Sequence, residues 1–125
     1  MIAQSSEYSA ALTDYVQAQS VKALLNYGAT PEEVGALEEI AIAFQQEVAR
    51  YVWFGIEPGR LVRSALRNDL KDIMANATSR SLPSIQTLVV YLTKNLPTRA
   101  LGSEHAIKAW VEQGGIVGLQ MRARA

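Results

Sequence analysis

Hydrophobic residues recur along most of the chain at steps of three and four, which is the spacing of one face of an α-helix. The pattern predicts an all-α fold, a compact bundle of four to five helices with a long second helix. Its 125 residues, 49% of them hydrophobic, suit a single helical domain over residues 1–125.

The first helix is predicted to begin after Ser6 and to end at Gly28. Serine is a favourable N-cap, and glycine readily takes the left-handed conformation that ends many helices. The apolar stripe slips over residues 17–20, so we expect a kink or a break there. Residues 1–19 therefore have two alternatives, a helix packed on the bundle or a mobile N-terminal helical arm.

The strongest local signal in the sequence opens the second helix. Thr30 can cap it, Pro31 suits its first position, and Glu33 can complete a capping box. Apolar residues then alternate at steps of three and four over residues 34–51, as in a bundle or coiled-coil seam. We predict one helix of about six turns to Gly55, about 35 Å long. Such a seam fits an intramolecular bundle and a homodimer equally, so the oligomeric state stays open.

Three shorter helices are predicted over residues 58–76, 82–95 and 103–113, each opened by a proline or a serine cap. The expected buried face of the first comprises Leu61, Val62, Ala65, Leu66, Leu70, Ile73 and Met74. That of the second comprises Ile85, Leu88, Val89 and Leu92. Residues 116–119 are too few for an independent strand and should pack on the bundle, and residues 120–125 are expected to be a frayed tail.

Composition and motifs argue against most catalytic chemistry. The chain has no cysteine, which rules out disulfides, thiolate zinc sites and a cysteine nucleophile. Its one histidine is His105, and the sequence has no G-x-S-x-G motif, which would supply a nucleophilic serine as its partner. Adjacent acids such as Glu38 and Glu39 diverge on a helix and make a poor metal site. We therefore predict no enzyme activity, no metal and no cofactor.

Hydropathy predicts a protein that does not enter a membrane. The longest uncharged stretch, residues 81–93, is too short and too polar to cross a bilayer. The N-terminal residues lack the basic and apolar regions of a secretory signal. A cytoplasmic protein is therefore expected.

Charge is balanced overall but divided between the two halves of the chain. Residues 1–57 hold eight acids and two bases, and residues 58–125 hold four acids and ten bases. The candidate partner-binding residues on the acidic side are Glu32, Glu33, Glu38, Glu39 and Glu47. On the basic side, steps of three, four and four place Arg60, Arg63, Arg67 and Lys71 on one helical stripe. This stripe could be a solvated face, could pair with the acidic helix of its own or a partner copy, or could contact phosphate.

Two stretches, GIEPGRLVRSALRNDLKDIMANA and YLTKNLPTRALGSEHAIKAWVEQGG, resemble small proteins encoded by bacteriophages and prophages. The shared features are Pro58, Leu61, Asn68, Asp69, Leu70, Pro97, Gly102, Ser103, Trp110, Gly114 and Gly115. The resemblance covers the second half of the chain. It implies a bacterial host cytoplasm and brings no activity with it. We interpret Asn68 and Asp69 as a structural polar pair that hydrogen-bonds the loop at residues 97–102.

The leading functional hypothesis is a phage-type protein-interaction module. Its acidic helix would bind another protein, of the host or the phage, and could inhibit a host or defence complex by occupying a site meant for phosphate. The alternative is a nucleic-acid-binding accessory protein that uses the basic stripe, with affinity that falls steeply as salt rises.

Overall fold

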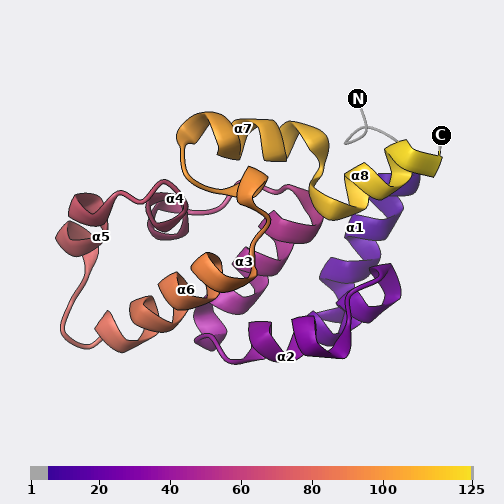
Figure 1. Ribbon diagram of the computed structural model, residues 1–125. Coiled ribbons are helices and arrows are strands. Elements are labelled where there is room, and N and C mark those ends of the chain that lie inside the picture. Colours follow the sequence, from indigo (N-terminus) through magenta and orange to yellow (C-terminus); the bar gives the residue numbers. More distant parts are fainter. Residues whose placement is uncertain (1–5, 125) are drawn as a thin grey trace.

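The computed structural model describes residues 6–124, and over that range it consists of helices and their connections (Figure 1). The α-helices are α1 (Ser6–Ala18), α2 (Pro31–Glu38), α3 (Ile42–Phe54), α4 (Arg60–Leu66), α5 (Leu70–Asn76), α6 (Leu82–Asn95), α7 (Glu104–Gln113) and α8 (Gly115–Arg124). Two 3₁₀ helices, η2 (Val21–Tyr27) and η3 (Thr98–Ala100), lie in the connections after α1 and α6. The all-α prediction is confirmed, but the helices are shorter and more numerous than the four to five expected.

Helix α3 lies at the centre of the fold, with α6, α7, α8 and α2 arranged around it (Figure 1). Apart from Arg50, its last turns are apolar, as expected for a helix surrounded by protein. The buried residues there are Val48, Ala49, Tyr51, Val52, Trp53 and Phe54. This end of α3 therefore forms the middle of one hydrophobic core.

Three tyrosines from the N-terminal part of the chain surround Phe54. The ring of Tyr15 stacks on it at 5.2 Å, while those of Tyr8 and Tyr27 meet it edge-on at 6.2 and 5.4 Å. Tyr8 also donates a hydrogen bond to the carbonyl of Phe54, and Tyr27 donates one to the carbonyl of Ala11. Buried tyrosines normally find such a partner, because an unpaired hydroxyl is costly away from water. Helix α1 is thereby docked on the core.

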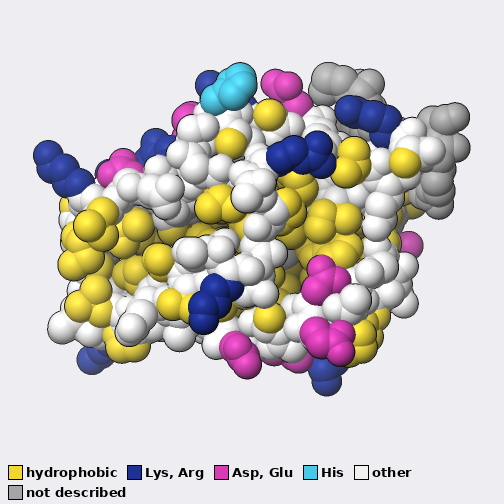
Figure 2. All heavy atoms as spheres, in the orientation of Figure 1, with side chains coloured by type: hydrophobic (Ala, Val, Ile, Leu, Met, Phe, Trp, Pro, Cys, Tyr) yellow, Lys and Arg dark blue, Asp and Glu magenta, His cyan; other side chains and the backbone are white. Residues whose placement is uncertain are grey.

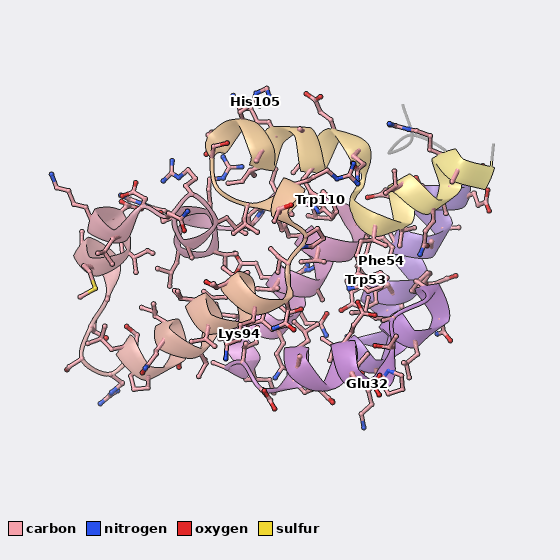
Figure 3. All side chains as sticks on the ribbon, viewed as in Figure 1. Glu32, Trp53, Phe54, Lys94, His105 and Trp110 are labelled. Carbon is pink, nitrogen blue, oxygen red and sulfur yellow. The ribbon has the colours of Figure 1, made fainter. Side chains whose placement is uncertain are left out.

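Two hydrogen bonds fasten the C-terminal half of the chain to α3. The hydroxyl of Tyr51 donates to the carbonyl of Ala100 at 2.6 Å, and Nε1 of Trp110 donates to the carbonyl of Tyr51 at 3.0 Å. All three residues are buried. Figure 3 shows Trp110 on α7, above Trp53 and Phe54 on α3.

Several local predictions are confirmed. Thr30 and Glu33 form the capping box, and Gly28 ends the preceding helix at φ 97°. The expected break after α1 occurs at Gln19, which has φ 54°. Residues 1–19 were expected either to pack on the bundle or to form a mobile arm. Within this segment, Tyr8 and Tyr15 are buried, and residues 1–5 lie outside the described range.

The single long helix predicted over residues 30–55 is wrong. Helix α2 ends at Glu38, Ala41 has the extended ψ of 139°, and α3 begins at Ile42. The side chain of Gln45 donates from Nε2 to the carbonyls of Glu38 and Ile40, at 3.2 and 2.9 Å. It thus donates to carbonyls that would accept backbone hydrogen bonds in a continuous helix. The chain can therefore break the helix here without glycine or proline.

The helix predicted over residues 58–76 is also divided. Asn68 takes the left-handed φ of 61°, and Asp69 caps α5 by accepting from the backbone N–H of Asp72 at 3.0 Å. Asn68 and Asp69 therefore have a structural role, which is to form the break between α4 and α5. The hydrogen bond to the loop at residues 97–102 comes instead from the backbone, between Gly102 N–H and the Leu66 carbonyl at 2.7 Å.

The C-terminal segment forms a helix that the sequence pattern did not predict. Helix α8 begins at Gly115 and packs along α3, and Val117 is buried between them. It continues to Arg124, so residues 120–124 are helical rather than frayed, and Ala125 lies outside the described range. Tertiary packing on α3 compensates for the poor helix propensity of its glycines.

Candidate interaction surfaces

The five glutamates predicted as one acidic face have different roles. Glu33 completes the capping box by accepting from the backbone N–H of Thr30 at 2.9 Å. Glu47 lies on α3, beyond the break, and accepts from the backbone N–H of Gly59. Glu32, Glu38 and Glu39 are exposed, and none has an ion pair within the described range. The acidic face is thus reduced to three available carboxylates around α2, where Figure 3 shows Glu32 pointing outward.

The four cations predicted as one stripe are split by the break after α4. Arg60 and Arg63 lie on α4, Arg67 caps its end, and Lys71 belongs to α5. Arg60 pairs with Asp72 at 2.8 Å, and Arg63 pairs with Glu104 at 2.7 Å and with Glu57 at 3.1 Å. Arg67 lies 3.4 Å from Asp69 and 3.6 Å from Glu104. Three of the four cations are therefore paired within the chain.

The partners of these arginines are not the predicted ones. The second half of the chain contributes Asp69, Asp72 and Glu104, and Glu57 comes from the turn before α4. None of the glutamates of α2 takes part. The interpretation that the basic stripe pairs with the acidic second helix of the same chain is thus wrong for the described residues. The negative charge of α2 remains available to solvent.

Asp72 is the most strongly held carboxylate of this network. It accepts hydrogen bonds from Arg60 and from the fully buried hydroxyl of Ser64. These bonds favour the charged form and lower the pKa of Asp72 from 3.8 to about 2. Asp72 is therefore ionised at any physiological pH and neutralises Arg60.

His105 points outward from α7 into solvent (Figure 3). No group of three or more His, Asp or Glu side chains between residues 6 and 124 is placed to hold a metal ion. Over the same range, no helix is long and apolar enough to span a bilayer.

An apolar groove opens between α5 and α6. It has a volume of about 330 Å³, and its lining consists of Ala65, Asn68, Leu70, Ile73, Met74, Leu82, Ile85, Gln86 and Val89. Ala65, Ile73 and Ile85 are buried and form its floor. In Figure 2, hydrophobic side chains gather at the left end of the molecule, where Figure 1 places α5 and the first turns of α6.

The walls of this groove are unusually exposed for large hydrophobic side chains. Leu70 is 69% exposed, Met74 52%, Leu82 40% and Val89 38%. Two other hollows contain charged side chains, Glu7 and Asp14 in one and Glu39 and Lys94 in the other. The lining of the α5–α6 groove has no charged residue. A concave, uncharged surface of this kind typically marks a binding site.

The sequence pattern assigned Leu70, Met74 and Val89 to buried faces, and this assignment is wrong. The break at Asn68 separates α5 from α4, so Leu70 and Met74 do not continue the buried face of α4, whereas Ile73 stays buried. A signal was present, because asparagine tolerates the left-handed conformation and aspartate is a strong N-cap. The pair Asn68 and Asp69 therefore encodes the break that opens the groove.

Comparison of the chain with protein-family models, with curated proteins and with solved structures gives no match.

Proposed function

We propose that this protein is an interaction module that binds a helix of another protein in the groove between α5 and α6. The observation that carries the proposal is the exposure of Leu70, Met74, Leu82 and Val89 around a buried apolar floor. Burying apolar surface is the main source of favourable free energy in protein association. Helices commonly bind in such grooves through apolar anchors on one face.

The architecture of the rest of the molecule supports this reading. The aromatic side chains Trp53, Phe54 and Trp110 are buried and fasten the helices to α3. The groove thus sits at the edge of a closed core, with its floor of Ile73 and Ile85 belonging to that core. A buried floor with exposed apolar walls is well suited to binding, since methionine in particular adapts to the shape of a partner.

The acidic residues Glu32, Glu38 and Glu39 form a second proposed contact region. They are exposed, and their negative charge is not used by the arginine network. In a bacterial cytoplasm they would attract a partner with a basic surface. Host or defence complexes that bind phosphate have such a surface, so this region would suit an inhibitor of one of them. Reversing all three to lysine should then lower the association rate and its salt dependence. Unchanged association would refute a role for this region.

The proposed function is tested by affinity capture from nuclease-treated bacterial lysate. The groove variant is Leu70→Gln/Met74→Gln, which removes two exposed anchors without changing charge. The matched control is Leu25→Gln/Ile42→Gln, which removes two exposed apolar side chains outside the groove lining. The proposal expects a partner that the wild type and the control retain and the groove variant loses. A partner retained equally by all three proteins would contradict it.

The nucleic-acid alternative receives less support from the geometry. Arg60, Arg63 and Arg67 are all engaged by carboxylates, so phosphate would have to displace existing ion pairs. Dedicated nucleic-acid binders instead present free cations that release counterions on contact. A gel-shift titration at low salt distinguishes the two proposals, because binding there by wild type but not by Arg63→Gln would favour the alternative.

A further inference from the structure

We infer that the occupant of the α5–α6 groove is an acidic amphipathic helix of a partner protein. This inference rests on the proposed function, and it specifies the chemistry of the helix that the groove selects.

The rim of the groove is left positive by the pairing of its neighbouring charges. The charged residues between positions 65 and 90 are Arg67, Asp69, Lys71, Asp72 and Arg80. Asp69 is paired with Arg67, and Asp72 is paired with Arg60. Both carboxylates are thereby neutralised.

Lys71 and Arg80 are the remaining charges beside the groove. Both are exposed, and neither has an ion pair within residues 6–124. Lys71 directly follows the wall residue Leu70 on α5, and Arg80 lies in the turn that leads to Leu82. Figure 2 shows basic side chains projecting from the upper and lower edges of the apolar area. A ligand with acidic residues beside its apolar stripe would complement both edges.

The spacing of the wall residues fits a short helix. Leu70 and Met74 are one helical turn apart on α5, and Leu82 and Val89 are two turns apart on α6. Seven helical residues span about 10 Å, so the groove accommodates about two turns of a partner helix. Such a partner presents apolar anchors at positions i, i+3 or i+4, and i+7.

The acidic helix α2 of a second copy of this chain is not a suitable occupant. This helix already turns its apolar residues Val34 and Leu37 to its own core, where they are 5% and 1% exposed. Placing α2 in the groove of another copy would require these side chains to leave the core. The chain's own acidic helix is thus held in its core, and we assign the groove to an acidic helix of a different protein.

The test uses the full chain and a yeast-displayed library of three-turn helical peptides. Each peptide carries Leu, Ile, Phe or Met on one stripe, and Glu or Lys at equal frequency in the flanking positions. Wild type should enrich Glu over Lys about threefold or more at those positions, because each exposed pair contributes modestly. Lys71→Glu/Arg80→Glu should reverse the preference. Leu70→Gln/Met74→Gln should enrich nothing, and Leu25→Gln/Ile42→Gln should behave as wild type.

The outcomes distinguish a failure of the acidic preference from a failure of the proposed function. Groove-dependent enrichment with equal Glu and Lys would overturn the acidic preference and leave the proposed function intact. Failure of the wild type to enrich more than the Leu70→Gln/Met74→Gln variant would overturn both. Sedimentation of the free protein adds a third outcome: a dimer that dissociates in the groove variant would identify a second copy as the occupant and overturn the inference.

Discussion

Gly55 and Gly115 bring the backbones of α3 and α8 into direct contact, and this contact yields the sharpest stability prediction. Both glycines have left-handed φ angles, 68° and 67°. A Cβ on Gly115 would lie 2.6 Å from the backbone nitrogen of Gly55 and 2.7 Å from that of Phe54. Backbone atoms cannot rotate away as a flexible side chain can, so Gly115→Ala must displace α8 or distort the end of α3.

The expected cost has two parts. The left-handed conformation costs a residue with a Cβ about 1 kcal/mol. Forcing extra volume into a packed backbone contact costs about 1–3 kcal/mol more. We therefore expect Gly115→Ala to lower the free energy of unfolding by about 3 kcal/mol, a substantial part of the stability of a typical small domain.

Urea denaturation followed by the fluorescence of Trp53 and Trp110, both buried, measures this loss. Gly102→Ala is the matched control for backbone strain, because Gly102 has φ 110° but no heavy atom within 4 Å of its added Cβ. It should lose only about 1 kcal/mol. Gly35→Ala, within α2 and also unobstructed, should gain about 0.5–1 kcal/mol. Equal stability of Gly115→Ala and Gly102→Ala would refute the close approach of α3 and α8.

Three further predictions concern single interactions. Because the pKa of Asp72 is lowered from 3.8 to about 2, its ionisation stabilises the fold above pH 3.8, and this contribution is lost as the pH falls toward 2. Urea midpoints of Asp72→Asn measured across that range should accordingly fall less steeply than those of wild type, and parallel curves would exclude the effect. Tyr51→Phe removes the hydrogen bond to the buried carbonyl of Ala100 and should cost about 1–2 kcal/mol by urea denaturation, more than Tyr27→Phe at its half-buried site. Thr30→Ala removes the N-cap of α2 and should cost about 1 kcal/mol; a change near zero in the same assay would show that the capping box contributes nothing.

Local signals predicted the class of the fold and several of its helix ends. The capping box at Thr30, the glycine stop at Gly28 and the break near Gln19 all follow from interactions within a few residues. Such interactions can be deduced from sequence, because both partners are close together in the chain. The breaks at Ala41 and Asn68 were missed, since a continuous apolar stripe across each position resembles one helix.

The candidate site depended more heavily on tertiary structure. Sequence spacing identified the arginines of α4 as a basic stripe but could not supply their partners, because Glu104 is 41 residues from Arg63 in the chain. It likewise placed Leu70 and Met74 in the core, because apolar periodicity shows that a face is hydrophobic and does not show what covers it.

The helical character, the positions of several caps and the division of charge can thus be deduced from the order of the amino acids. Which charges are neutralised, and which apolar face stays open, depends on how the helices pack in the folded chain. Caps and helical periodicity are local, whereas burial and ion pairing join segments far apart in the chain. The free carboxylates of α2 and the exposed walls of the α5–α6 groove result from that long-range arrangement.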